Sequence, residues 1–281
     1  MKKFTVLIFA LLLGGCSTKF AYNNADWLVY WYLDDYVELT NEQEDQFDLV
    51  FASFLDWHRQ NELPQYQAHL EDIISDIKTG NITADRIEEH RSRAREHWVR
   101  SRGYIAQDIV DFSTTMSKDQ MVYLFAQLEK ENVEDEEELL ERLEESEKDQ
   151  VKDWVKRNQK NSRRWLGKLN DDQKDFIAGF SDRFDSTRQH WIEYKREYQQ
   201  QLRIVFSNPE RGDAFKQKLF DLIVDPERFR SHEFQQAMDA NAATSAEYIM
   251  GLKDMMSNKQ MDKLINEIEE VKDDLVSLQS R

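Results

Sequence analysis

Apolar residues recur at three- and four-residue spacings along most of this chain, which is the spacing that places them on one face of an α-helix. Between residues 41 and 62, for example, Phe47, Val50, Phe51 and Phe54 follow this pattern. Stripes of the same kind predict helices over about 41–62, 64–79, 83–112, from 117 onward, 134–166, 170–205, 232–255 and 258–279. The segment 170–205 reads as a single helix of about 35 residues, roughly 50 Å long at 1.5 Å per residue.

Several helix starts and ends are marked by their own residues. Four elements share one form, a large apolar residue, a capping residue, two polar residues and a glutamine, and they begin at Leu39, Met116, Leu169 and Met256. This form is typical of a capping box, so we interpret the copies as four helix starts built alike. Pro64 fits the first turn of a helix, and Gly80 fits its end. Asn208-Pro209 and Asp225-Pro226 also read as a capping residue followed by proline.

An aromatic segment interrupts the periodic pattern near the beginning of the chain. Residues 27–33 are seven consecutive apolar or aromatic positions, and Asp26, Asp34 and Asp35 bracket them. A helix that is apolar on all sides is buried or lies in a lipid interface. We expect Trp27 to Tyr36 to belong to the protein core, and a membrane-interface belt is the alternative.

The composition supports the helical interpretation. Three prolines and eight glycines in 281 residues are too few for a turn-rich β-fold. We therefore predict an all-α, elongated bundle of about eight to ten helices. Residues 25–281 are expected to form a single helical domain, and a division into subdomains of about 25–167 and 168–281 is the alternative.

Charge is distributed unevenly along the chain. The net charge of −17 argues against a partner made of nucleic acid. Residues 129–149 hold twelve acidic and three basic residues, whereas 152–168 hold seven basic and one acidic. A solvated helix explains this segregation without a partner, and the alternative is that the basic stretch docks an acidic partner or an anionic saccharide. The candidate interaction surface consists of Lys152, Lys156, Arg157, Arg163 and Arg164, with Trp154 and Trp165 interleaved.

No motif predicts catalysis. The chain lacks the Glu-x-x-His pairs of di-iron bundles, the His-Glu-x-x-His motif and the Gly-x-Ser-x-Gly motif. His90 and His97 lie near Glu89 and Glu96, but such neighbours are expected by chance in a chain so rich in carboxylates. His58 falls on an apolar face, which favours a satisfied core or boundary histidine. We therefore predict no enzymatic activity, no metal site and no cofactor.

The first sixteen residues read as an export signal. Lys2 and Lys3 precede an apolar stretch from Phe4 to Leu13, and the only cysteine, Cys16, follows two glycines. Leu13 to Cys16 resembles the bacterial lipobox. This resemblance implies cleavage after residue 15, a thioether-linked diacylglycerol on Cys16, an acylated new N-terminus, and a short tether over 16–24. Because Ser17 rather than aspartate follows the cysteine, it also implies an outer-membrane location with the body in the periplasm.

Two wider resemblances follow from these motifs. Residues 20–43, with the aromatic run ending in Asp34-Asp35-Tyr36 and the later Trp57-His58 pair, resemble the opening of a family of uncharacterised proteobacterial lipoproteins. That resemblance implies a compartment and a helical fold, with no activity. The Leu39 to Gln43 element is similar to one in small helical periplasmic stress chaperones. We accordingly expect a structural or interaction role with an envelope protein partner, and a chaperone-like binder of unfolded proteins or an enzyme of unknown class are the alternatives.

Overall fold

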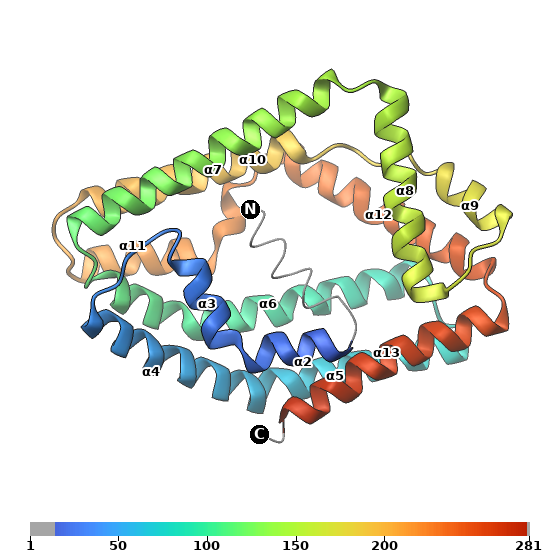
Figure 1. The fold of residues 1–281 in the computed structure, drawn as a ribbon, viewed down its shortest axis with the longest axis horizontal. Helices are drawn as coiled ribbons and strands as arrows, with labels where there is room; N and C mark the ends of the chain where they lie inside the picture. Colours follow the sequence, from blue (N-terminus) through green and yellow to red (C-terminus); the bar gives the residue numbers. More distant parts are fainter. Residues whose placement is uncertain (1–14, 280–281) are drawn as a thin grey trace.

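The computed structural model describes residues 15–279, with side chains from residue 19 onward, and it contains helices and no strand within that range (Figure 1). The prediction of an all-α fold is confirmed. The predicted signal peptide lies almost entirely in residues 1–14, outside the described part. The helices are α2 (Gly15–Asn23), α3 (Ala25–Leu33), α4 (Asn41–Trp57), α5 (Leu63–Thr79), α6 (Ala84–Ser113), α7 (Lys118–Glu144), α8 (Glu147–Leu166), α9 (Asp171–Ala178), α10 (Arg188–Ser207), α11 (Asp213–Val224), α12 (His232–Asp254) and α13 (Asn258–Gln279).

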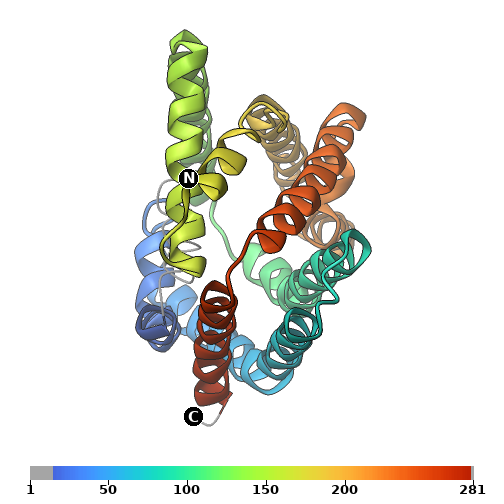
Figure 2. The same cartoon turned by 90° about the vertical axis from the view of Figure 1, so that its right-hand side faces the viewer.

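Helices from distant parts of the sequence pack in pairs. The helix α5 lies along α13, α6 packs against α11 and α12, and α7 lies along α10. Figures 1 and 2 show that these helix pairs together form an open frame. In it, α8 connects α7 to the end of the molecule that holds α9 and the start of α13. Elements before and after residue 167 are therefore in contact throughout the fold.

The helices α4 and α5 form one continuous helical path. A break was predicted between Glu62 and Pro64, but the π-helical turn η1 (His58–Glu62) joins the two helices instead. The backbone N–H of Leu63 bonds to the carbonyl of His58 across this turn. Because proline cannot supply the next backbone N–H, widening the helix just before Pro64 keeps the path helical where a break was expected.

The predicted helix 134–166 ends at Leu166 as expected, but its start and its continuity are wrong. The helix α7 begins at Lys118 and ends at Glu144, and α8 begins at Glu147. Between them Glu145 is extended, with ψ 143°, and the side chain of Ser146 accepts the backbone N–H of Asp149. A serine in the middle of a charged stripe therefore acts as an N-cap that starts a new helix.

The predicted single helix over 170–205 is also wrong. The helix α9 ends at Ala178 and α10 begins at Arg188. The connection between them is held by Asn241 of α12, whose side chain accepts the backbone N–H of Asp185 at 2.8 Å and donates to its carbonyl at 2.9 Å. A tertiary contact thus replaces the helical hydrogen bonds that the apolar stripe predicted.

The two Asx-proline pairs have different outcomes. Asp225 precedes the 3-10 helix η2 (Pro226–Phe229), so proline occupies the first turn of a short helix as predicted. Asn208 instead follows the last residue of α10, and α11 begins only at Asp213 after Gly212. The Asn208 side chain accepts the backbone N–H of Glu210 at 3.0 Å, a local turn that competes with helix initiation.

All four predicted capping boxes are present, and their glutamines also join the helices in pairs. The side-chain amides of Gln43 and Gln120 bond to one another, with N···O distances of 3.2 and 2.6 Å. This contact between two helix starts is a joint, and each amide also donates across it to a backbone carbonyl. Gln43 donates to the carbonyl of Thr115, and Gln120 donates to that of Glu38. The starts of α4 and α7 are thereby held together.

The second glutamine pair repeats this arrangement at the other end of the molecule. Gln173 and Gln260 bond reciprocally at 3.1 and 3.0 Å, and they donate to the carbonyls of Met255 and Lys168. In both joints the accepting carbonyl lies two residues before the partner's capping residue. The four repeated elements therefore start four helices and also hold those helix starts together in two pairs.

Two N-terminal predictions need correction. The expected tether over 16–24 is largely the helix α2, which packs along α13 because Tyr22 lies against Leu63, Leu275 and Leu278. The expected burial of the aromatic segment is wrong for α3, which has no buried residue. Only Tyr36 and Val37, just after that helix, enter the core.

Candidate interaction site

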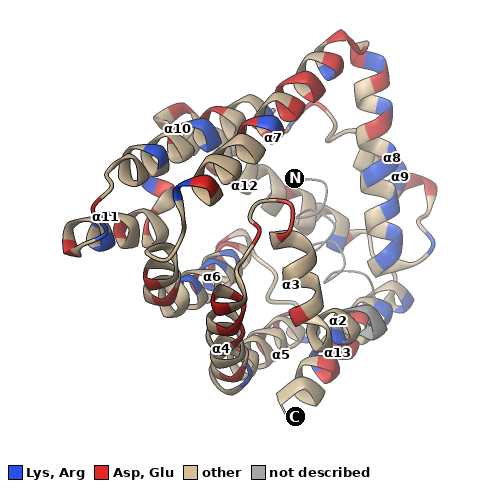
Figure 3. Ribbon diagram, turned by 60° about the vertical axis from the view of Figure 1, so that its left-hand side comes forward, with Lys and Arg blue, Asp and Glu red and all other residues tan. Residues whose placement is uncertain are grey.

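The predicted basic surface lies on α8, and only part of it faces solvent. Lys152, Lys156, Arg157 and Arg163 are exposed, while Arg164 is half-buried with its guanidinium 5.2 Å from the ring of Trp165. Figure 3 shows the basic residues of α8 next to the acidic end of α7. The cations are therefore available to an acidic partner.

The two tryptophans of this predicted surface point to the interior. Both Trp154 and Trp165 pack against the core cluster that contains Leu166, Ile177 and Leu252. The ring of Trp154 also lies 5.8 Å from that of Phe184. They anchor α8 to the frame, because large aromatic rings bury the most apolar surface per residue. The outward face of α8 thus presents charge without interleaved aromatics.

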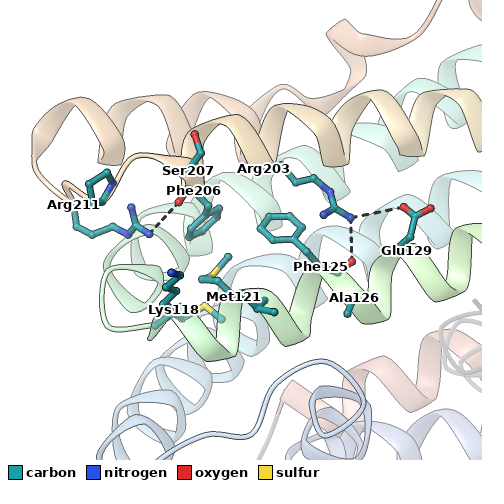
Figure 4. Close-up of a pocket in the computed structure, with 12 residues that line it drawn as sticks. Lys118, Met121, Phe125, Ala126, Glu129, Arg203, Phe206, Ser207 and Arg211 are labelled. Atoms are coloured by element: carbon teal, nitrogen blue, oxygen red, sulfur yellow. Dashed lines mark hydrogen bonds and ion pairs between the residues drawn. The ribbon is translucent and has the colours of Figure 1, made fainter.

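A groove with a volume of about 1160 Å³ lies between α7 and α10 (Figure 4). Its floor is aromatic, with the rings of Phe125 and Phe206 packed edge to face at 6.2 Å. Met116 and Met121 line the end nearest the start of α7, and Val122 is 62% exposed beside them. Methionine side chains adapt to different apolar shapes, so this floor can accept an irregular apolar surface.

The groove is positively charged on an otherwise acidic protein. Lys118, Arg203 and Arg211 line it, with Glu129 as the acidic residue among the lining side chains. Arg203 stacks 4.7 Å from the centre of the Phe125 ring and donates to the Phe125 carbonyl at 3.0 Å. Arg211 stacks on Phe206 and Phe215, so both guanidinium groups are held against aromatic rings. This combination fits a segment that carries apolar side chains and carboxylates.

A second cavity, of about 440 Å³, lies where α5, α6, α8, α12 and α13 meet. Half of its lining residues are isoleucine or leucine, and Met256 and Met261 also line it. The apolar residues at the capping boxes before α7 and α13 therefore line the two cavities in corresponding ways. Periodicity in the sequence did not show this, because the opposite walls come from distant helices.

A chain of three histidines connects α5 to α6, and two of them, His69 and His97, are buried. His90 Nε2 lies 2.8 Å from Asp76 Oδ2, and its Nδ1 lies 3.1 Å from His69 Nε2. His69 Nδ1 lies 3.2 Å from His97 Nε2, and Arg100 Nη2 lies 2.5 Å from His97 Nδ1. The sequence placed His90 and His97 on one helix but could not show that His69 of α5 lies between them.

Each ring nitrogen of this chain has a polar neighbour, and His97 Nδ1 also lies 3.3 Å from Glu62 Oε2. If each histidine donates toward Asp76, one ring proton serves each of the three links, and His97 Nδ1 is left to accept from Arg100. Burial lowers the pKa of His69 to about 4 and also lowers that of His97, consistent with neutral rings. Burial alone would raise the pKa of Asp76, but hydrogen bonds from Arg86, Asn81 and His90 outweigh it and lower that pKa.

Within residues 15–279 no group of three or more histidine, cysteine, aspartate or glutamate side chains is arranged to hold a metal ion. His58 is held separately, with Nδ1 3.0 Å from the Tyr22 hydroxyl and Nε2 3.2 Å from the Tyr66 hydroxyl. The interpretation of His58 as a satisfied boundary histidine is confirmed.

The fold and these surfaces define an all-helical protein with helix-lined grooves. Residues 35–235 match the model of DUF6279, described as a family of unknown function. The chain belongs to that family, which confirms the expectation of an uncharacterised family; the match begins after the predicted lipobox. The comparison with curated proteins and the comparison with solved structures gave no match.

Among the described residues, every helix is too short or too polar to cross a membrane. Cys16 falls in the first turn of α2, and its side chain is outside the described part.

Proposed function

We propose that this protein is a lipoprotein anchored in the outer membrane through Cys16, with its helical body in the periplasm. In this proposal it binds another envelope protein through a helical surface and has no catalytic role. The lysines, apolar stretch and glycines before the single cysteine support the anchor. The grooves of the helical frame support the binding role.

The groove between α7 and α10 is the observation that carries the binding role. At about 1160 Å³ it exceeds the usual volume of a small-molecule pocket, roughly 300–1,000 Å³. Its aromatic floor and its arginines are enriched features of protein interfaces. The partner segment that fits it best presents apolar side chains flanked by aspartate or glutamate, since three cations line the groove.

Photo-cross-linking in intact cells tests this assignment. A photoreactive residue at position 122, in the groove, should capture one predominant envelope protein. The same residue at position 140 is the control, because Val122 and Leu140 are both on α7 and both 62% exposed. In addition, Val122→Asp should reduce the captured complex at least tenfold, and Leu140→Asp should leave it unchanged. Equal capture from both positions would contradict the groove assignment.

The same experiment separates the alternative role. The adaptable methionines of the groove favour a chaperone-like binder of unfolded proteins as the second candidate. A chaperone would yield many captured proteins from position 122 and would suppress aggregation of an unrelated unfolded protein. A single stable partner without such suppression supports the interaction role.

The anchor has its own test. Cys16→Ser should block lipid attachment, so the variant should accumulate uncleaved or leave the outer-membrane fraction. Wild-type protein found in the inner-membrane fraction would contradict the predicted location.

A further inference from the structure

Three large aromatic side chains at the start of the protein face solvent. Phe20 of α2 is 66% exposed, and Trp27 and Trp31 of α3 are 61% and 37% exposed. The rings of Trp27 and Trp31 stack with their centres 6.4 Å apart. Exposed patches of this kind mark sites of contact with proteins or membranes.

The opposite side of this segment is fixed to the body of the protein. Tyr22 packs into the α5–α13 contact and bonds to His58. The Tyr30 hydroxyl donates to Asp48 of α4 at 2.7 Å, and its ring lies 5.3 Å from that of Phe47. Tyr22 and Tyr30 therefore fix α2 and α3 to the frame, while Phe20, Trp27 and Trp31 of the same two helices face outward.

The chain leading into α2 places this surface near a bilayer. Phe20 lies one helical turn beyond Cys16, and Trp27 follows after a further two turns' length of chain. If Cys16 carries a lipid, as proposed above, then the start of α2 lies at the membrane surface, and α2 is only about 13 Å long at 1.5 Å per residue.

We propose that Phe20, Trp27 and Trp31 form a membrane-contact face that lies in the headgroup region of a phospholipid bilayer. This inference rests on the proposed anchor and adds an orientation to it, with α2 and α3 against the lipid and the frame beyond them. Tryptophan is favoured at this depth because its ring is apolar and its N–H can bond to headgroups and water. Asp26, Asp34 and Asp35 lie beside the face, so a zwitterionic surface suits it better than an anionic one.

Quenching by brominated lipid tests this face on the full lipidated protein. The protein is reconstituted in phosphatidylcholine vesicles with or without bromine on the acyl chains, and tryptophan fluorescence is compared. The double variant Trp27→Phe with Trp31→Phe should lose most of the bromine-dependent quenching. Trp98→Phe is the matched control, because Trp98 is 58% exposed on α6, and it should leave that quenching unchanged.

The outcomes distinguish the face from the anchor. Failure of the wild-type protein to float with the vesicles, or a mass without the lipid, would contradict the anchor. Normal flotation with the same loss of quenching in both variants would overturn the membrane-contact face alone. A dimer in dilute detergent that Trp27→Ala converts to a monomer would also overturn it, by assigning the face to a second copy of the chain.

Discussion

At the scale of single residues, the four glutamines of the capping boxes carry more of the fold than their sequence context suggested. Each accepts a backbone N–H at its own helix start and donates to a carbonyl of another helix start. Gln173 is fully buried, so its amide is an obligatory part of a closed hydrogen-bond network. Such networks stabilise only when every member is satisfied.

Gln173→Ala should therefore be strongly destabilising. It removes the bonds to the backbone N–H of Asn170, to the carbonyl of Met255 and to the amide of Gln260, which keeps its bonds to Ser257 and Lys168. At roughly 1–3 kcal/mol for each unsatisfied group, we expect a loss of about 3 kcal/mol in the free energy of unfolding, measured with urea. Gln189→Ala is the control, because Gln189 is exposed and bonds only along its own helix. It should change stability by no more than about 0.5 kcal/mol.

At the scale of elements, the imidazoles of η1 and of the α5–α6 pair determine the expected response to acid. Burial lowers the pKa of both His58 and His69 to about 4, below the ordinary value of about 6.5 for an exposed imidazole. The unfolded chain then binds more protons than the folded one between those two values. Stability is therefore present above pH 6.5 and is lost as the pH falls toward 4.

The melting temperature should accordingly fall steadily between pH 6.5 and 4. The double variant His58→Asn with His69→Asn should have a lower melting temperature at pH 7.5 but a flatter profile over that range. A profile as steep as that of the wild type would assign the pH dependence to other groups. The paired carboxylates Glu62 and Asp76 have lowered pKa values, so their contribution is lost only at more acidic pH.

Two helix glycines make a second test at this scale. In α12, a Cβ on Gly251 would lie only 2.7 Å from Cε2 of the Phe176 ring, so Gly251 allows α9 to approach. We expect Gly251→Ala to cost about 1–3 kcal/mol through overpacking. In α6, Gly103 has no neighbour within 4 Å of such an atom, and Gly103→Ala should stabilise by roughly 0.5–1 kcal/mol through helix propensity. Thermal unfolding of the two variants should shift in opposite directions.

At the scale of the whole molecule, the frame separates two candidate binding surfaces. The aromatic groove lies between α7 and α10, and the exposed cations lie on α8. Because Arg164 packs on Trp165, a clean charge reversal uses the exposed residues Lys152, Lys156 and Arg163. The triple change to glutamate should keep the helical circular dichroism, since exposed charges contribute little to folding.

The effect of this reversal on the captured complex decides whether α8 contributes to binding. If α8 docks the acidic partner, the triple variant should yield less of the complex cross-linked from position 122, as the Val122→Asp variant does. If the complex is unaffected, the basic stretch serves as a solvated helix and the groove alone binds. Helical content that falls in the triple variant would contradict the placement of these side chains on the surface.

Local patterns in the sequence determined the helical class and most helix starts. The capping residues Thr40, Thr83 and Ser117 begin helices where predicted, and Gly80 ends one with φ +74°. These features depend on hydrogen bonds within a few residues, so the sequence alone is sufficient to indicate them. The single cysteine and its flanking residues likewise predict an anchor without reference to the fold.

Only the tertiary structure decided what these elements meet. The break before α10 depends on Asn241, and the histidine chain needs His69 from a different helix. The groove has one wall from α7 and one from α10, about eighty residues apart in the sequence. Helical periodicity reports which side of a helix is apolar but not which partner covers it, so the paired glutamines, the groove and the exposed face of Trp27 became visible only once the helices were packed.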